Sequence, residues 1–143
     1  MRYASMIASV LLALLALPGA ALADRSLQHG IHEIHFNAMP SARLPAEVAE
    51  TYNIPRSRLQ GFVIVSVLEH GEPVRATIRG HARTDGDESR ELRFRRVETG
   101  GRISHIGMVR IDDGETLNFE LDVRPQMRDE TYPVHFRETF YLD

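Results

Sequence analysis

The stretch of sequence that decides the fold is residues 61–68, Gly-Phe-Val-Ile-Val-Ser-Val-Leu. Side chains alternate between the two faces of a β-strand, so Phe62, Ile64 and Leu68 lie on one face and the three valines on the other. A strand with one face in water alternates apolar and polar residues, whereas this stretch is apolar on both faces. We therefore expect a central strand that other parts of the chain cover on both sides.

Outward from this strand, most of the chain after residue 24 alternates apolar and polar residues between turn signals. This pattern predicts about seven strands, at residues 31–38, 61–68, 74–82, 91–97, 103–111, 116–123 and 132–142. Asp113-Gly114 is typical of a two-residue hairpin turn. Half-apolar strands joined by short turns indicate an all-β fold, an antiparallel β-sandwich of the immunoglobulin-like type. A small β-barrel is the alternative.

One stretch breaks the strand pattern and predicts a short helix after the first strand: residues 44–52, Leu-Pro-Ala-Glu-Val-Ala-Glu-Thr-Tyr. Pro45 suits the first helical position, Glu47 suits the first turn, and Asn53 can take the left-handed backbone conformation that ends a helix. A helix of so few turns is not stable alone in water. We expect it to cover the second face of the central strand through Leu44, Val48 and Tyr52.

The segment at residues 1–23 is typical of a cleaved secretory signal peptide. Arg2 supplies a positive start, an apolar run follows, and Ala21-Leu22-Ala23 places small residues at the two positions that a signal peptidase reads. Cleavage after Ala23 would leave residues 24–143 as a single β-sandwich domain. We expect a periplasmic protein, with secretion as the alternative. A retained membrane anchor is the disfavoured alternative, because the apolar run is shorter than the about 20 residues that span a bilayer and ends in a cleavage pattern. No transmembrane segment is expected after cleavage.

Composition excludes several classes of function. The chain of 143 residues contains no cysteine, which excludes thiol catalysis and cysteine-ligated metal sites. Its formal net charge of −3 at pH 7 argues against nucleic acid as a partner. It has arginine but no lysine, and arginine suits bidentate contacts with carboxylate or phosphate groups. No cofactor is expected, and the oligomeric state and the strand order stay open.

Several segments carry a resemblance to a known family: His35-Phe36-Asn37-Ala38, residues 44–57, Gly61 with Val65-Ser66-Val67, and the closing Thr139-Phe140-Tyr141. In these segments the chain is similar to the uncharacterised bacterial family called domain of unknown function 4426. The resemblance spans nearly all of the chain after the leader. It implies a signal peptide and a sandwich-like β domain, and it brings no activity. The chain departs from the family at Asn53, where glycine is typical, and at Leu44, where a threonine usually precedes the proline.

A stripe of arginines is the first candidate binding surface. The outward faces of two successive predicted strands carry Arg75, Arg79, Arg83, Arg93 and Arg95. If the Asp85-Gly86 turn pairs these strands, Arg79 and Arg95 lie roughly opposite each other, and like charges in that position are destabilising unless an anion or a carboxylate sits between them. One hypothesis is a docking face for an anionic lipid head group or an acidic envelope protein. The favoured alternative is a solvated face balanced by nearby carboxylates.

A second polar group surrounds the predicted helix and consists of Asn37, Tyr52, Arg56 and Ser57. These residues could line a ligand notch at one end of the sandwich. The favoured alternative is structural, with Asn37 and Arg56 binding the free backbone groups at the helix ends.

No constellation of residues indicates catalysis. His29, His32 and His35 are close in sequence, but ligands on one strand must share a face; on a continuous strand His29 would share a face with His35, and His32 would point the other way. Ser66 lacks the Gly-x-Ser-x-Gly turn that exposes a nucleophile. The leading hypothesis is therefore a non-catalytic periplasmic binding or adaptor module that engages a protein or an anionic envelope component. The alternatives are a metal-dependent hydrolase that uses histidines and a small-molecule carrier.

Overall fold

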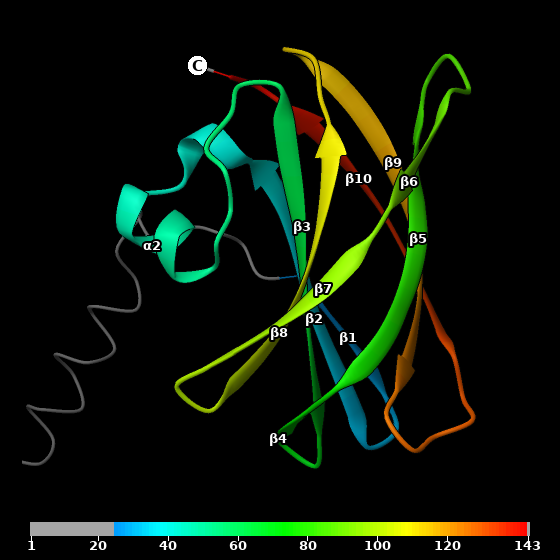
Figure 1. Ribbon diagram of the computed structural model, residues 1–143. Coiled ribbons are helices and arrows are strands. Elements are labelled where there is room, and N and C mark those ends of the chain that lie inside the picture. The colour runs from blue at the N-terminus through cyan, green and yellow to red at the C-terminus, as the bar shows by residue number, and fades with distance from the viewer. Residues whose placement is uncertain (1–24, 143) are drawn as a thin grey trace, which may run out of the picture.

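The computed structural model describes residues 25–142 and contains two antiparallel β-sheets packed face to face (Figure 1). Sheet A has the strand order β1 (Arg25–His29), β2 (His32–Pro40), β3 (Gln60–Glu69), β8 (Arg102–Arg110) and β7 (Phe94–Thr99), with β4 (Glu72–Val74) also paired to β3. Sheet B has the order β10 (Tyr132–Phe140), β9 (Glu115–Pro125), β5 (Ala76–Thr84) and β6 (Ser89–Leu92). The predicted antiparallel β-sandwich is confirmed. The small barrel does not form, because each sheet keeps its own edges.

The predicted signal peptide lies outside the described residues. Between residues 25 and 142, no helix has both the length and the apolar content that crossing a lipid bilayer requires.

Two predicted strands turn out to be divided between the sheets. The predicted strand at 74–82 leaves sheet A and enters sheet B at Arg75, and the one at 91–97 returns to sheet A at Arg93. Side-chain alternation continues through both crossings, so the sequence pattern carries no mark of them. The expected hairpin at Asp113-Gly114 is also wrong, because this turn joins β8 of sheet A to β9 of sheet B.

The first hairpin was missed by the sequence pattern. β1 pairs with β2 through a turn in which Gly30 has a φ of 58°, a conformation that glycine adopts without strain. β1 also closes one side of the sandwich, since Arg25 pairs with Glu138 of β10 and lies over the ring of Phe136.

The core between the sheets is built on the valine face of β3. Val63, Val65 and Val67 are fully buried there, together with Phe119 and Phe140 from sheet B. Burying side chains of this size stabilises a fold by roughly 1.5–3 kcal/mol each. This confirms that the valine face of the central strand is covered, as the sequence predicted.

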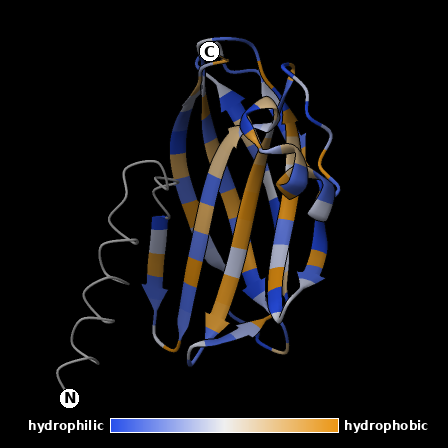
Figure 2. Cartoon of the chain, turned by 90° about the vertical axis from the view of Figure 1, so that its left-hand side faces the viewer, coloured by the Kyte–Doolittle hydropathy of each residue, from blue (hydrophilic) through white to orange (hydrophobic). Residues whose placement is uncertain are grey.

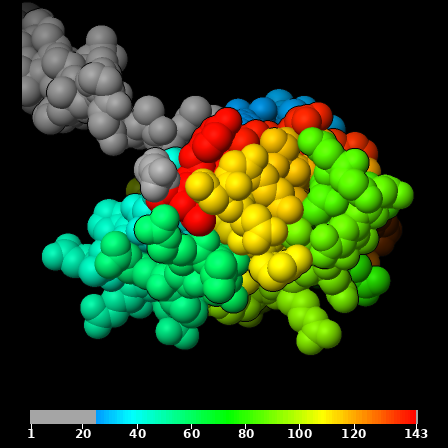
Figure 3. Space-filling view, turned by 90° about the horizontal axis from the view of Figure 1, so that it is seen from above, coloured from blue at the N-terminus to red at the C-terminus, as the bar shows by residue number. Residues whose placement is uncertain are grey.

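The other face of β3 is covered by the segment between β2 and β3. This segment forms a short 3-10 helix, η1 (Ser41–Arg43), and the helix α2 (Ala46–Thr51), and it projects to one side of the sandwich (Figure 3). Its contact with Phe62 is made by Leu44, Ala49 and Ile54, all about 5% exposed or less.

The predicted set of covering residues was partly wrong. Leu44 covers the strand as expected, Tyr52 is half-buried, and Val48 is 37% exposed. Ala49 takes the buried position, because its small side chain lets the helix lie close to the sheet. Asn53 ends α2 with a φ of 52°, as the sequence predicted.

A buried histidine joins sheet A to the point where the chain enters sheet B. His105 is 3% exposed; its Nδ1 donates to the Val65 carbonyl (3.1 Å), and its Nε2 accepts from the Ala76 N–H (3.1 Å). These two contacts require a neutral ring with the proton on Nδ1. Burial lowers the pKa of His105 below its usual value, and the nearby Arg96 lowers it further, while the Val65 carbonyl and Glu98 oppose the shift.

We predict that this histidine makes the fold less stable in acid. Between the usual pKa of about 6.5 in the unfolded chain and the lowered pKa of the folded chain, the unfolded state binds a proton at this position and the folded state largely does not, so the free energy of unfolding falls by up to about 1.4 kcal/mol for each pH unit. Urea unfolding of wild-type protein and His105→Gln between pH 7.5 and pH 5 measures this effect, and the variant should lose less stability over that range. His135→Gln, at an exposed position, is the control and should keep the wild-type slope. Equal slopes for wild type and His105→Gln would contradict the assignment.

Candidate binding site

The outer face of sheet A carries a groove under α2, with a volume of about 300 Å³. We call it the α2 groove. Its floor is formed by residues of β2, β3 and β8: His35, Asn37, Met39, Phe62, Ile64, Ser66, Arg102 and Ser104. Its roof is formed by Leu44, Val48, Tyr52 and Ile54. Figure 2 shows this face, with α2 over one end of a central strand that is largely orange.

The groove is apolar at one end and polar at the other. The β2–β3 register places Met39 beside Phe62 at the end under the helix, and His35 beside Ser66 at the open end. Ser104 and Arg102 also line the groove, and they follow each other along the same face of β8. A molecule in the groove would therefore meet apolar side chains with one part and hydrogen-bond donors with the other.

Several polar groups in the groove have no partner in the part of the chain that the structure describes. The hydroxyls of Ser66, Ser104 and Tyr52 make no hydrogen bond within residues 25–142, and Arg102 makes no ion pair there. Ser104 is only 4% exposed. These groups face the open groove, and several hydrogen-bond donors that have no partner among the described residues and converge on one groove are available to a ligand.

The roof is held in place from two directions. Arg95 of β7 donates from Nη2 to the carbonyls of Tyr52 (2.6 Å) and Asn53 (2.8 Å), which are free carbonyls at the end of α2. At the other side, the buried Ser41 hydroxyl donates to the Ser57 carbonyl (3.0 Å) and accepts from the Ser57 N–H (2.9 Å). These contacts close the segment that carries α2 into a loop and set the depth of the groove before any ligand binds.

Comparison with known proteins identifies the family. The sequence profile of the family described as "Domain of unknown function (DUF4426)" matches residues 26–143. The chain belongs to the DUF4426 family. The resemblance seen in the sequence is thereby confirmed. None of the curated proteins matches this sequence.

Two solved structures are similar to this DUF4426 chain. A DUF4426 family protein from Pseudomonas aeruginosa PAO1 has 28% sequence identity and a TM-score of 0.74, over 84% of this chain and 96% of that one. A copper-bound variant of FetP from uropathogenic Escherichia coli strain F11 has 9% identity and a TM-score of 0.58, over 82% of this chain and 94% of that one. At 9% identity the second similarity concerns the fold alone.

Two members of the predicted polar group line the groove of this DUF4426 domain, and two do not. Asn37 is on the floor, where its Oδ1 accepts from the Ala38 N–H (2.9 Å), and Tyr52 is in the roof. Arg56 instead donates to the Ala42 carbonyl (3.4 Å), and Ser57 is bound to Ser41 through its backbone. The structure therefore divides the group into groove residues and residues that hold the α2 segment.

The arginine stripe is also divided. The expected opposition of Arg79 and Arg95 is wrong, because Arg79 lies in sheet B opposite Asp122 and Arg95 lies in sheet A. Arg75 pairs with Glu98 (2.7 Å), and Arg83 pairs with Asp87 (3.2 Å). Arg93 is exposed at the second crossing between the sheets. The anion-docking hypothesis for this set as a whole stays a prediction.

The three neighbouring histidines do not converge. Because Gly30 lies in a turn, His29 faces His32 across the β1–β2 hairpin, and His35 lies on the outer face of the sheet. His32 contacts the Glu69 carboxylate (2.9 Å) and the Tyr132 hydroxyl (3.0 Å), while His35 contacts Glu33 (3.0 Å). Within residues 25–142, no three side chains of the kinds that bind metals are placed to share one ion.

Sequence reasoning missed four polar residues of the groove as ligand contacts, namely His35, Ser66, Arg102 and Ser104. One signal could have found Ser66, since a serine interrupts an otherwise apolar face of the central strand. Arg102 and Ser104 enter the groove only because β8 pairs with β3, and no local pattern reports which strands are neighbours.

We predict that Arg95 stabilises the roof, whereas the neighbouring Arg93 makes no measurable contribution to the free energy of unfolding. Arg95→Gln removes charged donors from two helix-end carbonyls, so the free energy of unfolding should fall by about 1 kcal/mol. Arg93→Gln has the same charge change and no ion-pair partner among residues 25–142, so it should stay within about 0.5 kcal/mol of wild type. Denaturant unfolding of both variants compares them. Equal effects would show that Arg95 does not hold the helix.

Proposed function

We propose that this DUF4426 domain is a non-catalytic binding module of the cell envelope, and that the α2 groove is its ligand site. The observation that carries the proposal is the convergence of Ser66, Ser104 and Arg102, which have no partner within residues 25–142, on one end of a groove whose other end is apolar. The volume lies at the lower end of the range for small-molecule sites, which begins at about 300 Å³.

The lining indicates an amphipathic ligand. A volume of about 300 Å³ holds an apolar group of about ten non-hydrogen atoms, if each takes the ~30 Å³ that a water molecule occupies in the liquid. The apolar part would lie on Phe62 and Ile64 under the roof. Arg102 at the open end favours a carboxylate or another anionic head, since hydrogen bonds to charged groups are the stronger ones. A short fatty acid, or an acyl chain with an acidic head, has this chemistry.

Binding is favoured over catalysis by the position of the serine. Ser66 lies in β3, which pairs with β2 along one edge and with β8 and β4 along the other. The backbone N–H groups near Ser66 therefore donate to neighbouring strands. They do not converge to stabilise an oxyanion, which nucleophilic acyl transfer requires.

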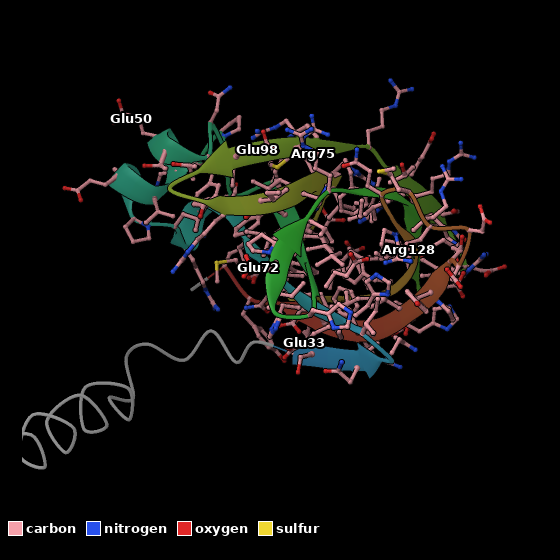
Figure 4. The ribbon with its side chains drawn as sticks, turned by 90° about the horizontal axis from the view of Figure 1, so that it is seen from below. Glu33, Glu50, Glu72, Arg75, Glu98 and Arg128 are labelled. Atoms are coloured by element: carbon pink, nitrogen blue, oxygen red, sulfur yellow. The ribbon has the colours of Figure 1, made fainter. Side chains whose placement is uncertain are left out.

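We predict that decanoate binds in the groove and that filling the roof blocks it. Val48 lines the groove and is already 37% exposed, so Val48→Trp should occupy the apolar end without unfolding the domain. Glu50→Trp is the matched control, since Glu50 lies on the same helix and projects away from the molecule (Figure 4). Titration calorimetry should detect decanoate binding to wild type and to Glu50→Trp, and none to Val48→Trp.

The head-group assignment has its own test. Arg102→Gln should weaken decanoate binding about tenfold, the effect of losing one hydrogen bond to a charged group, and should leave binding of uncharged decanol unchanged. If wild type binds neither compound, or if both tryptophan variants lose binding equally, the groove is not the ligand site.

The same proposal places the protein in the periplasm after cleavage of its leader. Intact-mass measurement of protein from the periplasmic fraction should find a chain that begins at Asp24, because Ala21 and Ala23 present the small residues that signal peptidases require. Ala23→Phe is the control and should remain unprocessed. A wild-type species that keeps Met1 in the membrane fraction would contradict this localisation.

A further inference from the structure

A second hollow lies where the chain crosses from β4 to β5, and arginines surround it. Its volume is about 590 Å³, and its polar lining consists of Arg75, Arg96, Arg124 and Arg128 together with Thr77, Gln126 and one carboxylate, that of Asp129. We call it the arginine cleft. Figure 4 looks at this end of the molecule, with Arg75 and Arg128 labelled.

The two sheets separate at this point, which is why the cleft exists. β6 pairs with β5 only from Gly80 onward, so within residues 25–142 no strand covers this edge of β5 at residues 76–78. Across this gap, Arg96 pairs with His105 in the β7–β8 register and therefore lies on the inward face of sheet A. The backbone N–H of Gln126 donates to the Arg75 carbonyl (2.8 Å) and ties the loop after β9 to the crossing.

Two of the four guanidinium groups are held in fixed positions by carboxylates. Arg75 binds Glu98 through two nitrogens (2.7 and 3.3 Å), and Arg128 binds Glu69 (2.9 Å). Such pairs orient the guanidinium planes and leave their remaining N–H donors free. The cleft is therefore already arranged around its cations.

The other two arginines have little or no compensation. Arg96 lies 3.7 Å from Glu98, a carboxylate that it shares with Arg75. Arg124 has no ion pair within residues 25–142 and is exposed. Like charges gathered around one hollow repel each other, and an anion bound among them removes this cost.

We propose that the arginine cleft binds a phosphate group, either that of a lipid head group or that of a soluble molecule. Planar guanidinium groups match phosphate oxygens through bidentate hydrogen bonds, and the Thr77 hydroxyl and Gln126 amide add neutral donors. Met127, on the same loop, is 93% exposed and supplies an apolar contact next to the phosphate, which suits the lipid source. This site is separate from the α2 groove, and neither proposal depends on the other.

The test uses pyrophosphate as the probe and two double variants of equal charge. Arg96→Gln/Arg124→Gln removes the two less compensated arginines of the cleft, and Arg79→Gln/Arg93→Gln removes two exposed arginines that do not line it. Titration calorimetry should show binding to wild type and to the second variant, about tenfold weaker binding to the first, and a loss of affinity as sodium chloride screens the charges. Thermal unfolding of each variant checks that it is folded.

A second measurement, cosedimentation with lipid vesicles, identifies the source of the phosphate. The probe is a phosphatidylcholine vesicle that contains phosphatidylglycerol. If wild-type protein cosediments with these vesicles and Arg96→Gln/Arg124→Gln does not, the phosphate belongs to a lipid head group. Pyrophosphate binding without cosedimentation assigns a soluble phosphate compound. The proposal is overturned if wild-type protein binds neither probe, or if both double variants weaken binding to the same extent, which would indicate a general effect of net charge.

Discussion

Both faces of β3 must leave water, and the rest of the structure depends on this constraint. Its valine face packs against sheet B, whereas its other face, with Phe62 and Ile64, lies on the outside of the sandwich. A sheet cannot bury that outer face by itself, so the chain supplies a cover between β2 and β3. Because α2 has only six residues, it covers one end of the outer face and leaves the other end open. The α2 groove begins under this cover and runs out to the part of β3 that the cover does not reach.

The two crossings between the sheets have a comparable effect on the opposite part of the molecule. The chain leaves sheet A at Arg75 and returns to it at Arg93, and these two crossings join the sheets along one side. At each crossing the backbone passes from one sheet to the other and forms no strand pairing. The gap becomes the arginine cleft, and His105 joins the sheets beside it by binding the Ala76 N–H. Each candidate site thus lies where strand pairing or strand cover stops.

The candidate site residues show how far local patterns reach. Tyr52 and Asn37 were identified from the sequence because they lie next to a segment whose helical pattern is strong, and both line the groove. Ser104 and Arg102 were missed, because they reach the groove through the pairing of β8 with β3. Arg95 was placed on an anion-docking face, yet it binds the end of α2, a contact between residues more than forty positions apart. Pairing over such separations leaves no periodic trace in the chain.

By itself, the sequence determined the all-β class, the doubly covered central strand, the short helix and the residue that ends it, because each follows from side-chain alternation, apolar content or backbone preference within a few residues. Only the tertiary structure decided which strand belongs to which sheet, where the chain crosses between them and which side chains meet in the α2 groove and the arginine cleft. The physical reason is that alternation is the same on both sides of a crossing: at Arg75 and Arg93 the side chains keep their period of two while the backbone exchanges one hydrogen-bonding neighbour for another.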